Sequence, residues 1–227
     1  MKRIVVVAPH PDDETLGCGG MMLDAIAAGH EVTWVIVSCM SSGPTLESDR
    51  ITKRELEIEQ VSLAYNVKET VRLGFPTTRL DTIPNSELID SFSKVFKRIL
   101  PTDVYLPYRS DAHSDHAAVF NAGIAVTKWF RYPSVLRIYA YETPSETDFD
   151  LSPDTNGFRP NVFVDISAFI DRKLEIANIF EGEFSEHPFP RSLQGLRALA
   201  EVRGAAAGYN AAESFMLLRE RKSKKSS

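Results

Sequence analysis

Short apolar runs alternate along the chain with longer stretches in which apolar residues recur at every third or fourth position. The short runs are rich in β-branched residues and lack polar/apolar alternation, a pattern typical of parallel strands that are buried on both faces. Strands are predicted at 4–8, 32–38, 71–75, 104–107, 136–141 and 162–165, and helices at 19–28, 51–66, 87–100, 117–129, 168–180 and 191–203. This alternation predicts an α/β fold, a Rossmann-like, doubly wound, mostly parallel sheet with helices on both faces.

Segments rich in polar or small residues join these elements, and loops are predicted at 39–48, 76–85, 143–159 and 203–215. In the charged second helix, we expect Leu56, Leu63 and Ala64 to face the core. No internal repeat or linker divides the chain. We therefore expect a single domain over residues 1–218, followed by a basic tail at 219–227 whose end is frayed.

Composition and charge narrow the class of protein. The length of 227 residues suits one domain, and 43% hydrophobic with 25% charged residues is ordinary for a globular protein. The net charge is −5 and basic residues cluster only in the tail, which argues against a nucleic-acid partner. No apolar run is long enough to span a membrane. Cys18 and Cys39 lie in or beside apolar segments, so we expect reduced thiols in a cytoplasmic protein.

An acidic cluster with one histidine follows the first predicted strand: His10-Pro11-Asp12-Asp13-Glu14. Open α/β sheets bind their ligands at the carboxyl ends of the strands. Adjacent carboxylates at such a place repel each other unless a cation lies between them. The imidazole of His10 and the carboxylate of Asp13 offer the nitrogen and oxygen donors that zinc accepts. The stretch therefore predicts a metal site at this edge of the sheet.

Two other interpretations explain less of this stretch. An aspartate at a helix N-cap would explain one carboxylate, but not three acidic residues beside a histidine. A dinucleotide-binding loop would use Gly17 and Gly19, but its G-x-G-x-x-G pattern requires a glycine where Met22 stands. That loop would also avoid negative charge near a pyrophosphate.

A second polar cluster follows the predicted strand 104–107 and contains His113, Asp115 and His116. A predicted helix begins directly after it, as one does after the first cluster. Three of the five histidines therefore lie at the carboxyl ends of predicted parallel strands. Because those ends share one edge of the sheet, both clusters are expected to contribute to one metal site.

Together, the two clusters resemble the LmbE/PIG-L family of zinc-dependent N-acetylglucosaminyl deacetylases, which carries P-H-P-D-D-E after its first strand and H-x-D-H after a later one. Further fragments resemble family segments: Arg54 and Glu57, Leu73-Gly74-Phe75-Pro76 with Arg79-Leu80-Asp81, Tyr141-Glu142, Arg203-Gly204 and Ala212-Glu213-Ser214-Phe215. Thr77 stands where the family usually has an aspartate. The resemblance extends from Ile4 to about Phe215.

The resemblance implies a catalytic metal and a base beside it. His10, Asp13 and His116 would be the ligands of one divalent metal per chain, with zinc the first candidate. Three protein ligands leave one position for a water, whose pKa falls toward ~7 on zinc. Asp12 would be the general base that takes a proton from this water.

The resemblance also implies how the substrate is handled. His113 would stabilise the oxyanion or protonate the leaving amine, and Asp115 would orient His113. Arg54 and Asp81 would contact sugar hydroxyls. The implied reaction hydrolyses the acetamide of an N-acetylglucosamine-type conjugate and releases acetate and a free amino sugar.

The expected partner is thus a small N-acetylated amino-sugar conjugate, held by loops at the carboxyl ends of the strands, including 39–48 and 76–85. A homo-oligomer is a further expectation from the resemblance, and no residue of the chain indicates one by itself.

Two functions of other classes stay open. A metal-dependent hydrolase of another bond, such as a phosphoester, would favour a second metal and basic phosphate clamps, and the motif loops offer only Arg109. A non-catalytic sugar- or nucleotide-binding domain on the same fold would not need Asp12 or His113 beside a complete ligand set.

Overall fold

The computed structural model of the chain describes residues 1–40, 48–150 and 157–222, and contains one seven-stranded sheet. The strands are β1 (Arg3–Ala8), β2 (Glu31–Cys39), β3 (Glu69–Pro76), β4 (Asp103–Pro107), β5 (Arg137–Tyr141), β6 (Val162–Asp165) and β7 (Ala212–Glu220). Their order is β3-β2-β1-β4-β5-β7-β6, and the pairs from β3 to β5 are parallel. β7 pairs antiparallel with both of its neighbours. The predicted mostly parallel α/β fold is confirmed.

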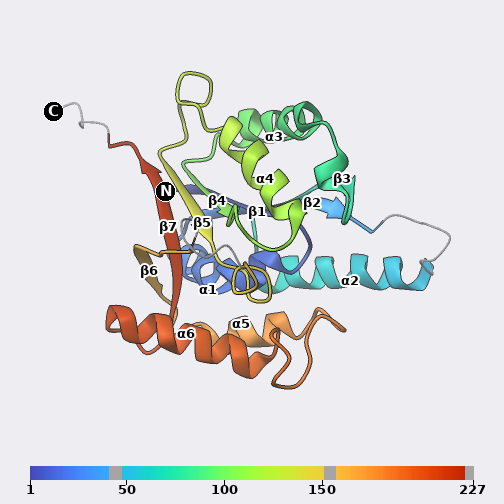
Figure 1. Cartoon of the computed structure of the whole chain (residues 1–227). Coiled ribbons are helices and arrows are strands. Elements are labelled where there is room, and N and C mark those ends of the chain that lie inside the picture. Colours follow the sequence, from blue (N-terminus) through green and yellow to red (C-terminus); the bar gives the residue numbers. More distant parts are fainter. Residues whose placement is uncertain (41–47, 151–156, 223–227) are drawn as a thin grey trace.

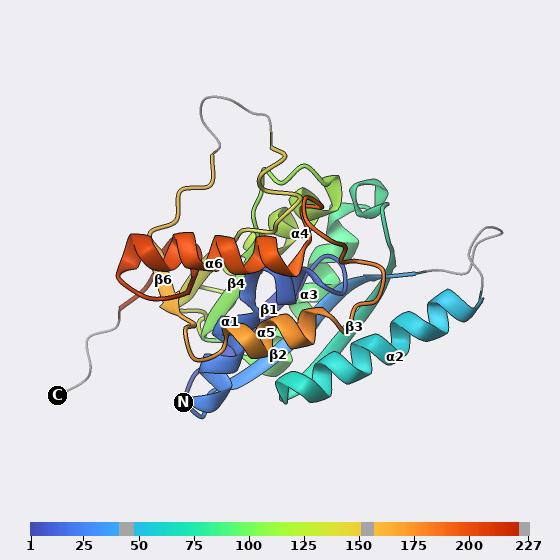
Figure 2. The same ribbon diagram turned by 90° about the horizontal axis from the view of Figure 1, so that it is seen from below.

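Helices cover both faces of this sheet (Figure 1). They are α1 (Asp13–Ala27), α2 (Ser48–Tyr65), α3 (Asn85–Ile99), α4 (Ser114–Ala125), α5 (Ile170–Ala177) and α6 (Leu193–Ala207), with a 3₁₀ helix η1 (Leu80–Thr82). In Figure 1, α3 and α4 lie on one side of the sheet and α1, α2, α5 and α6 on the other. Figure 2 shows the second group face on, with α5 and α6 forming an outer layer next to α1.

The central strand β1 shows why the strands lack alternation. Val5 and Val7 pack in the core cluster on the α3 and α4 side, whereas Ile4, Val6 and Ala8 pack in the cluster on the α1 and α2 side. All five side chains are buried. A strand buried on both faces cannot alternate between polar and apolar residues, which is the pattern read from the sequence.

The strand order places a binding crevice between β1 and β4. The chain leaves β1 for α1 on one face and leaves β4 for α4 on the other, so the connections diverge between these neighbouring strands. In open α/β sheets the ligand binds at such a switch point, outside the carboxyl ends of the strands. Both polar clusters of the sequence follow these two strands.

The first helix begins six residues earlier than the sequence predicts, at Asp13 rather than at residue 19. The glycines indicated a loop, but they are helical residues at close contacts. A Cβ on Gly17 would lie 2.4 Å from the ring of Tyr141, and one on Gly20 would lie 2.5 Å from Ile166. The consequence is that the acidic cluster lies in the first turn of α1.

The predicted loop at 203–215 is wrong. Helix α6 continues to Ala207 and ends at Gly208, which has a positive φ of 82°. Strand β7 then begins at Ala212 and runs to Glu220, so the sheet includes two residues of the expected tail. Small residues favoured a loop because they bury little area, yet β7 is held in the sheet by pairing with β5 and β6 on its two sides.

Two of the three residues expected to face the core from helix α2 do not. Leu56 and Leu63 are 53% and 80% exposed, whereas Ala64 packs against the core cluster beside the buried Ile58, Val61 and Tyr65. α2 also buries the charged side chains of Arg54 and Glu57. Buried charges need partners, and these partners lie in the candidate site.

Candidate active site

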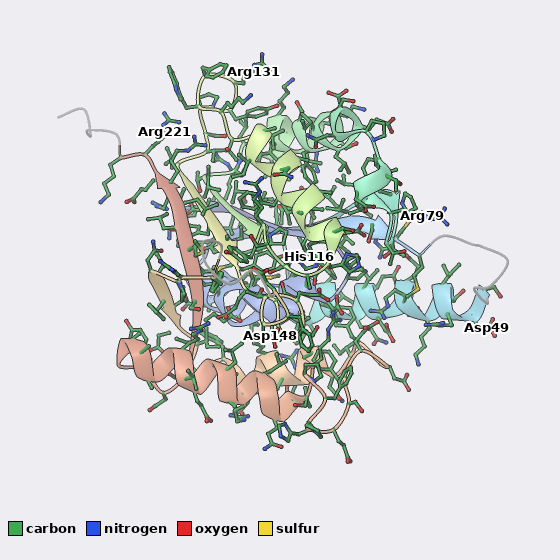
Figure 3. All side chains as sticks on the ribbon, viewed as in Figure 1. Asp49, Arg79, His116, Arg131, Asp148 and Arg221 are labelled. Carbon is green, nitrogen blue, oxygen red and sulfur yellow. The ribbon has the colours of Figure 1, made fainter. Side chains whose placement is uncertain are left out.

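The two sequence motifs meet at the carboxyl ends of β1 and β4. β1 delivers His10 and Asp12 in the turn that precedes α1, and Asp13 is the first residue of that helix. The loop after β4 carries His113, and His116 lies in the first turn of α4. Figure 3 shows His116 in the middle of the molecule, below α4 and above α1.

Three side chains direct donor atoms at one point. Asp13 Oδ2 lies 3.3 Å from His10 Nδ1 and 3.4 Å from His116 Nε2. The ligand atoms of these residues all lie within 4.8 Å of one another. Two ligands at ~2.0–2.1 Å from zinc and at a tetrahedral angle are ~3.3 Å apart. The observed spacings therefore match two edges of a tetrahedral zinc site.

Unpaired polar atoms support the same conclusion. Asp13 and His116 are fully buried. Among the residues that the structure describes, neither Asp13 Oδ1 nor His116 Nε2 has a hydrogen-bond partner. Leaving such buried atoms unpaired costs ~1–3 kcal/mol each, and a bound cation would remove this cost. The residues present thus fit a divalent metal.

Each of the two histidines in this group has a further carboxylate within hydrogen-bond distance of its other ring nitrogen. Asp115 Oδ2 lies 3.1 Å from His10 Nε2, and Asp111 Oδ2 lies 2.7 Å from His116 Nδ1. Metal-binding histidines commonly donate their other ring N–H to a carboxylate, which fixes the ring and the tautomer. Asp111 has no role in the sequence interpretation, although it lies in the same motif loop five residues before His116.

The electrostatics of the two imidazoles reflect these carboxylates. Burial lowers the pKa of His10, but Asp115 and Asp13 outweigh burial and raise the pKa to about 9. For His116, burial is likewise outweighed by Asp13 and Asp111, which raise its pKa to about 10. Burial would raise the pKa of Asp13, yet the histidines hold it well below its ordinary value. The pocket around these groups therefore favours positive charge.

A second group of potential ligands shares His10. Its other members are His113 and Asp115. The carboxylate of Asp115 is already engaged, because Oδ1 accepts the N–H of Leu80 and Oδ2 the N–H of Thr78, both at 2.8 Å. Burial would raise the pKa of Asp115, yet His10 and the Leu80 N–H hold this pKa below its usual value. This group suits hydrogen bonding better than metal binding.

Asp12 adjoins the group of ligands around Asp13 but is not a member of it. Its Oδ2 accepts a hydrogen bond from Arg191 at 2.8 Å, and its N–H donates to Glu14 Oε2 at 3.1 Å. The φ of Asp12 is 143°, a strained conformation for a residue with a side chain. Burial and the charge of Asp13 raise the pKa of Asp12 to about 7, with Arg191 opposing the rise. A carboxylate with such a pKa is suited to accept a proton near neutral pH.

His113 lines the same cavity as Asp12 and is half-buried. The bond that joins it to Asp115 runs from the Asp115 backbone N–H to His113 Nδ1, at 3.1 Å. Burial and the nearby His10 lower the pKa of His113. The ring is therefore neutral near pH 7, and because Nδ1 accepts a hydrogen bond, Nε2 carries the proton. His113 can thus donate a hydrogen bond from Nε2.

A cavity of about 200 Å³ opens beside these residues. Its polar lining includes His10, Asp12, His113, Arg54, Glu183 and Arg191. Cys39, Met40, Thr77 and Thr78 also line it, so both expected substrate loops reach the cavity. The rest of the first of these loops, 41–47, lies outside the described residues.

The two residues expected to contact sugar hydroxyls have different positions. Arg54 lines the cavity and donates to the carbonyl of Pro11 at 3.2 Å. Asp81 lies in η1, where it is exposed and outside the cavity lining. A substrate contact of Asp81 stays a prediction.

Sequence reasoning missed Arg191 and Glu183, which come from the segment between α5 and α6. Arg191 bridges Asp12 and Glu146, the latter at 3.2 Å, and also lies 3.5 Å from Glu183. No local sequence pattern indicates a site in this segment, because its residues meet the first motif only in the folded chain. Arg191 and Asp12, for example, are 179 positions apart in the sequence.

The chain is similar to several known proteins. Residues 5–127 match the PIG-L family model, described as GlcNAc-PI de-N-acetylase. Diacetylchitobiose deacetylase from Thermococcus kodakarensis is 28% identical over 231 residues, covering 95% of this chain and 82% of that protein. The solved structure of the conserved protein TT1542 from Thermus thermophilus has a TM-score of 0.77 at 25% identity, with 100% of this chain and 99% of that chain covered.

One structural relative carries out a different reaction. GalB of Pseudomonas putida, a 4-carboxy-2-hydroxymuconate hydratase, has a TM-score of 0.76 at 18% identity, and the match covers 100% of both chains. The fold alone therefore does not determine the reaction.

Family membership rests on the matched sequence. The PIG-L model spans more than half of the chain and includes the acidic cluster after β1 and the histidine cluster after β4. These are the residues that form the candidate metal site and its surroundings, and the resemblance stated from the sequence is confirmed. The chain belongs to the PIG-L family of metal-dependent N-deacetylases, hydrolases that break an amide C–N bond.

Proposed function

We propose that this protein removes the acetyl group from an N-acetylglucosamine-type sugar conjugate, with zinc as its metal. The observation that carries the proposal is the position of Asp12. It lies next to a three-residue ligand set without being part of it, and its carboxylate lines the cavity and pairs with Arg191. A binding domain would have no need of such a base.

The metal would be held by His10 Nδ1, Asp13 Oδ2 and His116 Nε2. When bound, zinc supplies a water of lowered pKa and a Lewis acid for the acetamide carbonyl. The carboxylate of Asp12 takes the proton of the attacking water.

His113 is proposed to act on the other side of the reacting amide. Its Nε2–H donates a hydrogen bond to the oxyanion that develops from the carbonyl. The proton that Asp12 took from the water passes to the leaving amine as the C–N bond breaks, which yields acetate and a free amino sugar. Asp115 holds both histidines of this region, His10 through its carboxylate and His113 through its backbone N–H.

The substrate class is supported by relatives and by the cavity. The relatives include the diacetylchitobiose deacetylase and a 1D-myo-inositol 2-acetamido-2-deoxy-α-D-glucopyranoside deacetylase from Nakamurella multipartita, both named for N-acetylated amino sugars. A cavity of about 200 Å³ is smaller than the ~300–1,000 Å³ typical of drug-sized ligands. It suits a single polar ring, with the attached group extending outward.

A phosphoester substrate is less well supported. The two arginines of the cavity are both paired with carboxylates, Arg54 with Glu57 and Glu183, and Arg191 with Asp12 and Glu146. Such neutralised guanidinium groups are poor phosphate clamps.

Over the described residues, no helix is long and apolar enough to cross a membrane.

Acetate release tests the proposal. Purified protein is incubated with a panel of N-acetylglucosaminyl conjugates, before and after treatment with a chelator, and again after addition of zinc. We expect acetate from at least one conjugate, loss of release with the chelator and recovery with zinc. Release that is indifferent to the chelator, or none from any conjugate by zinc-loaded protein, would contradict it.

A further inference from the structure

We propose that Glu183 binds the hydroxyl groups of the sugar ring and so determines which amino sugar enters the site. This inference rests on the proposed function and names a binding residue for it. Asp12 and Glu183 are the two carboxylates that line the cavity, within the part of the chain that the structure describes. Asp12 is assigned to the reacting water, which leaves Glu183 to face the remainder of the substrate.

Glu183 is held between two guanidinium groups. One of its oxygens accepts from Arg54, and the other lies 3.5 Å from Arg191. The side chain nevertheless retains 30% exposure, against 9% for Arg54 and 18% for Arg191. A carboxylate oxygen has two lone pairs, so Glu183 keeps acceptor capacity toward the cavity. Hydroxyl groups of a sugar are donors that fit such an acceptor.

The loop that carries Glu183 is anchored to α2. The N–H of Glu181 donates to Glu57 Oε1 at 3.2 Å, and Gly182 has a φ of 89°, which turns the chain back toward the cavity. Arg54 also stacks over the ring of Phe180, with its guanidinium carbon 5.5 Å from the ring centroid. Fixed loops and oriented side chains give a binding residue the preorganisation that recognition requires.

Glu183 also connects the binding end of the cavity to the catalytic end. Arg191 Nη1 lies 2.8 Å from Asp12 Oδ2 and 3.5 Å from Glu183. The carboxylate that receives the sugar therefore shares one guanidinium with the proposed base. A sugar bound at Glu183 therefore lies in the same cavity as Asp12, where its acetamide must react.

The experiment measures binding, so it does not depend on turnover. The methyl glycoside of N-acetylglucosamine and its 3-deoxy and 4-deoxy analogues are titrated by calorimetry into zinc-loaded wild-type protein, Glu183→Gln and Glu181→Gln. Glu181 is the matched control, because its side chain is 74% exposed and pairs only with Lys53 on the surface among the described ion pairs.

A hydrogen bond to a charged group contributes ~1.5–3 kcal/mol and one to a neutral group ~0.5–1.5 kcal/mol, so exchange of the Glu183 carboxylate for an amide is expected to weaken glycoside binding roughly 5- to 30-fold. The wild type and Glu181→Gln should bind at least one deoxy analogue clearly worse than the parent, whereas Glu183→Gln should discriminate less between the two. In acetate release, KM should rise while kcat changes little. Glu183→Asp retains the charge but shortens the reach, and we expect it to keep the wild-type melting temperature and still bind weakly.

Equal affinity of wild type and Glu183→Gln for the parent glycoside would overturn the inference, as would unchanged discrimination against the analogues. Absence of glycoside binding by the wild type would overturn it as well. If the wild type binds the glycoside through Glu183 but releases no acetate from any conjugate, the proposed function fails while this binding role stands.

Discussion

Replacing Asp111 by asparagine tests whether the metal ligands depend on their outer carboxylates. Asp111 Oδ2 lies 2.7 Å from His116 Nδ1, and its Oδ1 accepts from Thr147 at 2.6 Å. The side chain is buried, so water cannot replace the lost interaction. Asparagine keeps the shape and one acceptor oxygen, but it removes the negative charge that orients His116.

The expected cost follows from the type of hydrogen bond. A charged bond contributes ~1.5–3 kcal/mol and a neutral one ~0.5–1.5 kcal/mol. The exchange should therefore cost about 1–2 kcal/mol of metal binding, or roughly a 5- to 30-fold weaker Kd for zinc at ~1.4 kcal/mol per tenfold. This lies near the ~10- to 100-fold loss that is usual when the hydrogen-bond partner of a metal-binding histidine is mutated.

The assay is competition for zinc between the protein and a chromophoric chelator at fixed pH, with acetate release followed in parallel. Activity of Asp111→Asn should return toward the wild-type value as free zinc is raised. Asp148→Asn is the control, since Asp148 follows Thr147 in the same segment but is exposed (Figure 3). A folded Asp111→Asn protein with wild-type zinc affinity would refute the assigned role of Asp111.

Three further predictions concern other parts of the structure. Burial raises the pKa of the Cys18 thiol well above its ordinary value, so iodoacetamide should label the native protein at Cys39 instead. Because Cys39 lines the cavity, a saturating N-acetylglucosaminyl ligand should slow that labelling, and rapid labelling of Cys18 would contradict its burial. Gly17→Ala should lower the free energy of unfolding in urea by ~1–2 kcal/mol, because the new Cβ would meet a backbone carbonyl at 2.6 Å and overpacking exceeds the gain in helix propensity; a stabilised variant would contradict this contact. Arg191→Gln should keep its zinc content yet lower kcat ~10- to 100-fold through a misplaced Asp12, and unchanged kcat would exclude that role.

The parts of the fold that sequence reasoning predicted are those with local signals. β1 and β4 are short and buried, and β1 is also rich in β-branched residues, so their character is visible in a few consecutive residues. The two motifs follow these strands directly, and the parallel arrangement alone brings His10 near His116. The topology therefore predicts that both motifs meet at one site, and the family resemblance implies which of their residues would bind the metal.

The parts that sequence reasoning missed depend on contacts between distant segments. Gly17 indicates a loop by its composition, and only the neighbouring Tyr141 explains why a helix has glycine there. β7 owes its existence to pairing with β5 and β6 rather than to its own small residues. Arg191 and Glu183 reach the cavity through a connection between helices, where no pattern in the sequence predicts a site.

The central claim assigns different tasks to two adjacent, chemically identical residues, and one comparison tests it directly. Zinc content and acetate release are measured under the same conditions for Asp12→Asn and Asp13→Asn. Asp13 faces both imidazoles and Asp12 faces Arg191. Asp12→Asn should therefore retain zinc and lose roughly 10²–10⁴-fold in turnover, the usual contribution of a general base. Asp13→Asn should lose zinc and activity together and recover part of the activity when zinc is added. Zinc-free Asp12→Asn beside zinc-replete Asp13→Asn would show that the two roles are reversed.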